Sequence, residues 1–127
     1  MTPDETRDLA RRLFDALETG DVAAAKALYA PGAALWTNVT QRDANAADVA
    51  AFLPVFVKRM PDRRYADRRV IPFEGGFVHR HRLTGTRADG ARVAAECCVL
   101  VTVVEGQVTR MEEFLDSRQL DAVMSRG

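Results

Sequence analysis

The chain has no long apolar run and no excess of charge of either sign. No stretch approaches the roughly 18 consecutive apolar residues that a membrane-spanning helix needs, and the acidic start, residues 1–5, has no apolar signal-peptide segment. The 18 Lys and Arg residues balance 18 Asp and Glu residues, which argues against bulk attraction to nucleic acid or to an anionic membrane. We therefore expect no nucleic acid and no membrane among its partners.

Cysteine is scarce, and the two cysteines, Cys97 and Cys98, are neighbours. Adjacent residues of a strand point to opposite faces, so these two thiols are poorly placed to bond to each other. Free thiols, together with the missing signal peptide, indicate a reducing, cytoplasmic location. Two cysteines without a second cluster also argue against a zinc site.

The 127 residues, 47% of them hydrophobic, are enough for one domain with a core of its own. A capping box at residues 2–5 and a Gly at position 20 delimit the first expected helix. Apolar spacing and turn residues predict the other elements. Further helices are expected at residues 21–31, 46–60 and 117–124, and strands at 33–39, 64–73, 77–87, 91–104 and 108–115.

Three details of this pattern bear on the fold. Residues 41–45 look like a polar turn, and Pro54 is expected to kink or split the third helix because it removes a backbone donor.

The basic run Arg63-Arg64 and Arg68-Arg69 is interpreted as a solvated edge, paired with neighbouring aspartates, with an anionic ligand as the alternative. Tight hairpins join the last four strands, which makes those strands antiparallel neighbours.

Helices followed by a run of strands predict an α+β fold. We expect a cone-shaped, curved antiparallel β-sheet wrapped around three N-terminal helices, with an internal pocket where a small molecule would bind.

Three motifs then resemble the nuclear transport factor 2-like superfamily, which includes ketosteroid isomerases, SnoaL-type polyketide cyclases and limonene epoxide hydrolases. The motifs are GD at 20–21 with ALYAP at 27–31, LTGT at 83–86, and EGQVTRMEEFLD at 105–116. The WTN at 36–38, the HRLTG at 81–85 and the EFLDS at 113–117 are most similar to a SnoaL-like group. The resemblance covers nearly the whole chain and implies the cone-shaped fold, but this fold supports many functions.

The resemblance carries over only part of the known chemistry. Leu13 stands at the ketosteroid isomerase oxyanion tyrosine, Thr37 at the general-base aspartate, and Cys98 near the second aspartate, so ketosteroid isomerisation is not expected. The strand at 77–87 lacks the aspartate that limonene epoxide hydrolases use there. Glu113 matches their second aspartate and the acid/base aspartate of the polyketide cyclases.

Glu113 is therefore the first catalytic candidate. Alternation places Met111, Glu113 and Leu115 on one face of the last strand, and the resemblance places that face in the pocket. A carboxylate among apolar neighbours has a raised pKa and can exchange protons near neutral pH. The alternative is a buried carboxylate that bonds to a partner and only stabilises the fold.

His81 and His79 are the only histidines. They alternate with arginines, which favour water more strongly, so the imidazoles should face inward. His81 is the candidate to assist Glu113 as proton carrier, and His79 a binding residue. The alternatives are core histidines bonded to backbone, or a metal site with Glu96 or Glu113 as third ligand.

Trp36 and Asn38 share a face of the first strand. Trp36 is a candidate wall for a flat apolar ligand, and Asn38 a candidate donor to a substrate carbonyl; a core tryptophan and a turn asparagine are the alternatives.

On the strand at 91–104, the resemblance puts Glu96, Cys98 and Leu100 on the pocket side. The opposite apolar face, residues 95, 97, 99, 101 and 103, would then be exposed and would form a homodimer interface through the outer sheet face.

Taken together, these residues predict a small-molecule enzyme that uses no organic cofactor and no metal. It would perform acid–base isomerisation, cyclisation or hydrolysis on a hydrophobic carbonyl or epoxide compound, with Glu113 and His81 as catalytic residues. Trp36, Asn38, His79, Glu96, Cys98 and Met111 are the expected binding residues. The alternative is a non-catalytic module of the same fold that binds a small ligand or dimerises.

Overall fold

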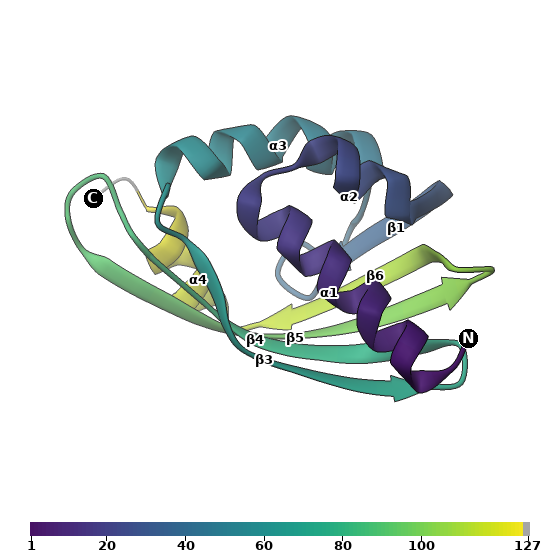
Figure 1. Ribbon diagram of the computed structural model, residues 1–127. Coiled ribbons are helices and arrows are strands. Elements are labelled where there is room, and N and C mark those ends of the chain that lie inside the picture. Colours follow the sequence, from purple (N-terminus) through teal and green to yellow (C-terminus); the bar gives the residue numbers. More distant parts are fainter. Residues whose placement is uncertain (126–127) are drawn as a thin grey trace.

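The computed structural model describes residues 1–125 and shows a curved six-stranded sheet with helices on its concave side (Figure 1). In chain order, the elements are α1 (Pro3–Thr19), α2 (Val22–Leu28), β1 (Tyr29–Thr37), β2 (Asp43–Asn45), α3 (Ala46–Arg59), β3 (Arg64–Phe73), β4 (Gly76–Thr86), β5 (Arg92–Val104), β6 (Gln107–Leu115) and α4 (Ser117–Met124). The predicted α+β fold is confirmed.

The sheet has the strand order β2-β1-β6-β5-β4-β3. Strands β3 to β6 are successive antiparallel neighbours, as their hairpins predict. Strand β1 joins the sheet differently, because it pairs in parallel with β6, with Leu35 opposite Met111 and Thr37 opposite Glu113. The sheet is therefore mixed, and β1 and β6 form the wall that carries Glu113.

Helix α1 begins and ends where its sequence predicts. Thr2 and Glu5 form the capping box, and Gly20 ends the helix in a left-handed conformation with φ of 81°. Arg63 adds a contact at this end that the sequence did not predict. Arg63 is 4% exposed, and its guanidinium donates a 2.9 Å hydrogen bond to the carbonyl of Leu17, so Arg63 does not belong to a solvated edge.

Helix α3 differs from its prediction in two respects. Pro54 stays inside one uninterrupted helix, where it is exposed. The predicted polar turn before the helix contains the short strand β2, and its last residue, Asn45, forms a second capping box with Asp48. This box aligns the first turn of α3 with β1, which pairs with β2.

The core lies between the helices and the sheet. Leu9, Leu13 and Phe14 of α1 are almost fully buried and pack in one cluster with Phe77 and Val99 of the sheet. A second cluster joins the C-terminal part of α3 to α4 through Phe56, Met60, Leu83, Cys97 and Val123, among others. The two cavities described below lie beside these clusters, one toward each end of α3.

Strand β5 turns the opposite face inward from the one predicted. Cys97 and Val99 are buried under the helices, whereas Glu96 and Cys98 are exposed on the outer face. Alternation separates the two sets correctly, but the resemblance assigned the wrong set to the interior. The homodimer prediction rested on an exposed apolar face formed by residues 95, 97, 99, 101 and 103, but these residues are buried under the helices. The homodimer itself is not tested by this structure and stays a prediction.

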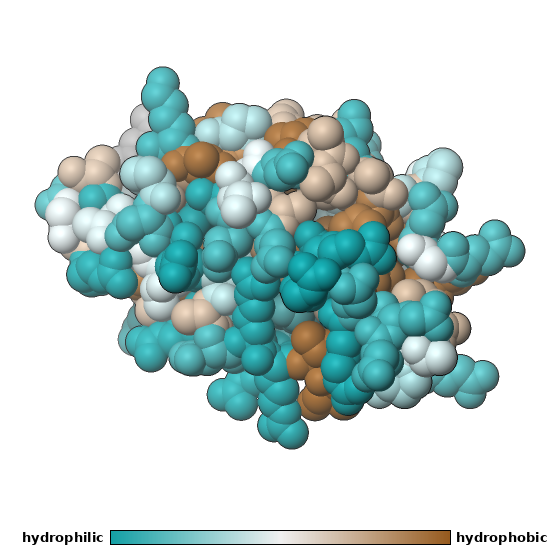
Figure 2. Space-filling view, in the orientation of Figure 1, coloured by the Kyte–Doolittle hydropathy of each residue, from teal (hydrophilic) through white to brown (hydrophobic). Residues whose placement is uncertain are grey.

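The surface is mixed rather than apolar. Figure 2 shows a side of the molecule covered mainly by hydrophilic side chains, with hydrophobic atoms in separate patches. Among residues 1–125, no helix is long and apolar enough to cross a membrane.

Candidate functional site

A cavity of about 320 Å³ opens between α3 and the β1–β6 wall, and it is called the Glu113 cavity below. Most of its lining is apolar, and its side-chain polar groups are the carboxylates of Glu113 and Asp48, the hydroxyl of Thr37 and the indole N–H of Trp36. The residues that line it are Leu35, Trp36, Thr37, Ala44, Asp48, Val49, Phe52, Met111 and Glu113.

Glu113 lies on the interior face of β6, between Thr37 of β1 and Val99 of β5 in the sheet register. Its apolar surroundings raise the pKa of its carboxyl above the ordinary value for glutamate, and burial is the whole cause. Within the described chain, no hydrogen-bond donor or cation offsets this shift. Glu113 and Met111 both lie where alternation on the last strand predicts; their roles stay predictions.

Two tyrosines lie near enough to Glu113 to feel its charge. Burial, and then the negative charge of Glu113, raise the pKa of the phenols of Tyr29 and Tyr65 above their ordinary value. The Tyr29 hydroxyl lies 3.5 Å from the Met111 sulfur, which is a weak acceptor. Both phenols are therefore neutral at physiological pH and able to donate.

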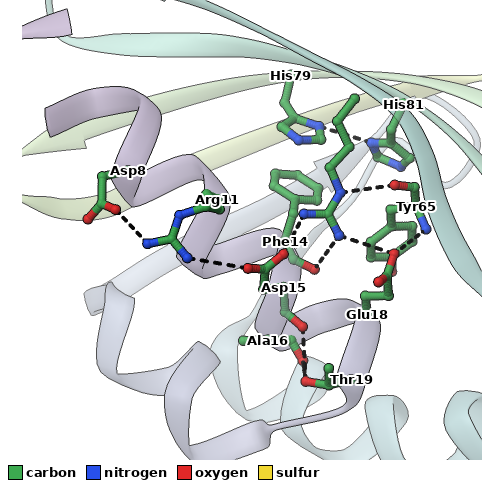
Figure 3. A network of polar contacts seen from close by, with 11 residues as sticks. Asp8, Arg11, Phe14, Asp15, Ala16, Glu18, Thr19, Tyr65, His79 and His81 are labelled. Carbon is green, nitrogen blue, oxygen red and sulfur yellow. Dashed lines mark hydrogen bonds and ion pairs between the residues drawn. The ribbon is translucent and has the colours of Figure 1, made fainter. Parts of the chain in front are cut away.

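The two histidines face inward, as alternation predicts, with exposures of 1% for His79 and 3% for His81. Their Nδ1 atoms are 3.1 Å apart, and the ring of His79 stacks on Phe14 at 3.5 Å between centroids (Figure 3). Burial, and then the positive charges of His81 and Arg68, lower the pKa of His79 to about 3. Burial, and then Arg68, lower the pKa of His81 to about 4.

The structure does not bring the histidines next to Glu113. His79 pairs across the sheet with Val99, and Val99 pairs with Glu113, so two strand spacings, about 9–10 Å, separate the backbones of His79 and Glu113. Among the described residues, those lining the Glu113 cavity include neither histidine. The expectation that His81 and His79 line the ligand pocket is therefore not met.

Arg68 fixes α1 above the histidines. It lies where the pairing of β3 with β4 shifts register between Ala66 and Arg69. Its guanidinium binds Asp15 at 2.6 Å and Glu18 at 3.1 Å, and Glu18 also accepts the Tyr65 N–H at 2.7 Å (Figure 3). The register shift explains why Arg68 points inward, in contrast to the solvated edge that was predicted.

Trp36 and Asn38 have different environments. Trp36 contributes to the cavity wall, while its ring packs against Phe114 with centroids 5.5 Å apart. The Asn38 amide is occupied, because it donates to the Leu115 carbonyl and accepts the Leu115 N–H, both at 3.0 Å. Asn38 thus extends the β1–β6 pairing and is not free to hold a substrate oxygen.

Glu96 and Cys98 cannot bind a ligand of the Glu113 cavity, because both lie on the outer face of the sheet. The Glu96 carboxylate is 3.7 Å from Arg82 there. The same placement excludes Glu96 as a third ligand beside the histidines. Over residues 1–125, no three His, Cys, Asp or Glu side chains come together as metal ligands would.

Several lining residues were missed by the sequence reasoning. Val49 and Phe52 of α3 were not among the expected binding residues, yet both line the cavity, where Phe52 is 43% exposed. Leu35 was overlooked because the prediction favoured Trp36 and Asn38 on the opposite face of β1, and Thr37 was considered only as the residue at the general-base position of the ketosteroid isomerases. A parallel β1–β6 pairing would have identified both, but no short-range pattern in the sequence reports it.

The SnoaL-like domain family matches residues 10–111, and the chain therefore belongs to this family, within the nuclear transport factor 2-like superfamily.

Solved structures agree on the fold. A candidate SnoaL-like polyketide cyclase from Jannaschia sp. CCS1 is 20% identical, with a TM-score of 0.83; the match covers 100% of this chain and 97% of that chain. The candidate hydroxylase AclR from Streptomyces galilaeus is 17% identical, with a TM-score of 0.82, covering 95% of this chain and 81% of that chain.

A third relative, a nuclear transport factor 2-like protein of unknown function from Burkholderia pseudomallei, is 14% identical, with a TM-score of 0.81, covering 98% and 99% of the two chains. Among curated proteins, no sequence matches this chain. At these identities the likeness shows the fold alone.

Proposed function

We propose that this protein is a small-molecule enzyme in which Glu113 carries a proton to or from a hydrophobic carbonyl or epoxide compound. The reaction would be an isomerisation, a cyclisation or a hydrolysis. The observation that carries this proposal is the Glu113 carboxyl itself, which lines an apolar cavity and has a raised pKa without an offsetting partner in the described chain.

A carboxyl in this state suits general acid–base chemistry. As a carboxylate it is poorly solvated, so it is a stronger base than a glutamate in water, and after taking a proton it can return it to another atom. With a ketone, Glu113 would remove a proton from the carbon beside the carbonyl, and the carbonyl oxygen would gain negative charge. The Thr37 hydroxyl is the polar side chain opposite Glu113 in the sheet register. It accepts the Thr40 N–H at 3.1 Å and lies 3.1 Å from the Thr40 hydroxyl, so its proton would have to turn from Thr40 to the substrate oxygen.

The test uses a flat apolar probe, 5-nitrobenzisoxazole. A base removes the proton from its ring carbon, the ring N–O bond breaks with that electron pair, and a coloured 2-cyano-4-nitrophenolate forms. The rate above background should rise with pH through the raised pKa of Glu113, because only the carboxylate is a base. We expect Glu113→Gln to abolish this rate.

Glu112→Gln is the matched control. Glu112 is the adjacent carboxylate on the same strand, but it lies on the outer face, where it pairs with Arg110 at 3.5 Å. Equal rates for the Glu113→Gln variant and the unmodified protein, or equal losses in both variants, would rule out Glu113 as the base.

A second candidate is a non-catalytic module that binds a small hydrophobic ligand. The occupied Asn38 amide favours it, as does the distance of the histidines from the cavity, because both reduce the number of groups free for catalysis. Trp36 is the only tryptophan, so its fluorescence reports on the cavity. Binding of 2-decalone that changes this fluorescence, with no Glu113-dependent rate on the probe, would favour the binding module.

A further inference from the structure

A second pocket, of about 320 Å³, lies at the other end of α3 and is called the α3–α4 pocket below. Its walls come from the last turns of α3, from α4 and from the β4–β5 hairpin, which lie together at the left of Figure 1. The residues that line it are Val55, Lys58, Arg59, Met60, Arg87, Ala88, Val123 and Ser125. The α3–α4 pocket shares none of its described lining with the Glu113 cavity.

Its charge is all of one sign. Lys58, Arg59 and Arg87 line the pocket, and no acidic residue of the described chain does. Arg87 is neutralised by Asp89, with contacts of 2.6 and 3.0 Å. Lys58 and Arg59 have no carboxylate partner within residues 1–125. The pocket therefore carries two positive charges that no described carboxylate neutralises, although the formal net charge of the whole chain is zero.

Its floor is apolar. Met60 and Val123 are 2% and 4% exposed and belong to the second core cluster, whereas Val55 is 51% exposed. An aliphatic chain that covered Val55 would bury apolar surface now in contact with water, which is favourable.

The walls are also held together before any ligand arrives. Arg59 donates to the Met124 carbonyl and Arg87 to the Ala122 carbonyl, both at 2.9 Å. These two bonds tie α3 and the hairpin to α4, so the cations are fixed at the pocket with less rotamer entropy left to lose on binding. Lys58 keeps a free ammonium that can reach an anion at the mouth.

We infer that the α3–α4 pocket binds a medium-chain aliphatic carboxylate, with its chain on Met60, Val55 and Val123 and its head group at Lys58 and Arg59. Apolar walls bearing a few convergent polar groups are the usual form of a small-molecule site. This inference does not depend on the proposed function, because the two sites share no described residue.

The experiment compares three probes with the same chain, octanoate, octylamine and 1-octanol, by NMR titration of the backbone amides. Octanoate should shift the amides near Lys58, Ala88 and Val123, while octylamine should leave them unchanged and 1-octanol should bind more weakly. Lys58→Glu should weaken octanoate binding by about five- to tenfold. Val55→Ser should weaken binding of octanoate and octanol alike.

Lys26→Glu is the matched control, since Lys26 is the other lysine, on α2, and does not line the pocket. Lys58 and Val55 are exposed, so neither variant should impair folding. The inference is overturned if octylamine binds as well as octanoate, if Lys58→Glu and Lys26→Glu have the same effect, or if octanoate shifts only residues of the Glu113 cavity.

Discussion

Glu113 should weaken the fold that holds it. The unfolded chain releases the Glu113 proton at the ordinary pKa of glutamate, whereas the folded chain holds it to higher pH because its surroundings are apolar. Stability therefore falls as the pH rises through the raised pKa. We expect Glu113→Gln to stabilise the protein at pH 8 and to have little effect near pH 4. Urea unfolding at both pH values measures this, and a loss of stability at pH 8 would contradict the raised pKa.

The histidine pair should have the opposite dependence. Both folded pKa values, about 3 and about 4, lie below the ordinary histidine pKa of 6.5, so the unfolded chain takes up protons first as the pH falls. Stability should decrease below pH 6.5 by up to roughly 1 kcal/mol per pH unit for each histidine. Besides each other, the rings face Phe14, Tyr65 and the positive Arg68.

The variant His79→Phe tests this dependence, because phenylalanine can keep the stack on Phe14 but cannot take up a proton. Its stability should fall less steeply between pH 6.5 and 4.5 than that of the unmodified protein, as followed by thermal unfolding. Parallel curves for the two proteins would show that the His79 imidazole takes up its proton as readily in the folded chain as in the unfolded chain.

At the scale of single elements, the β3–β4 hairpin depends on Gly76. A Cβ atom at this position would collide with the backbone carbonyl oxygen of Val101 on β5. We expect Gly76→Ala to destabilise the protein by about 2–3 kcal/mol, because neither strand can move without breaking its pairing. Gly75→Ala is the control: it has no neighbour within 4 Å and a φ of 91°, so only the left-handed backbone is penalised, by about 1 kcal/mol. Equal losses in chemical denaturation would show that the strands separate freely.

Element by element, local signals predicted most of the fold. The capping box at Thr2, Gly20 and the three hairpin turns are short-range features, and each lies where it was expected. The strand β2 and the parallel β1–β6 pairing depend on contacts between distant segments, which periodicity does not report.

The same limit explains why only part of the candidate site could be predicted from the sequence. Alternation placed Glu113 and both histidines on the interior side, but it could not tell which face of β5 is covered or that the register shift near Asp67 turns Arg68 inward.

At the scale of the whole molecule, the homodimer prediction is tested on the outer sheet face. Phe114 is 44% exposed there and packs on Trp36. If copies pair through this face, Phe114→Glu should convert a dimer to a monomer in sedimentation experiments, because a charge would be buried without a partner. Val39→Glu, at an apolar residue that is 37% exposed outside the strands, is the control. A monomer before any substitution would refute the prediction.

Strand β3 ends the sheet, so its outer side has backbone groups without a neighbouring strand. The register shift between Ala66 and Arg69, with Asp67 at a φ of 55°, breaks the regular ladder along this edge. Pro72 lacks an N–H to offer, and Arg64 and Arg69 are exposed. A foreign strand would find no continuous template here, so this edge of the sheet is guarded against edge-to-edge aggregation and amyloid growth.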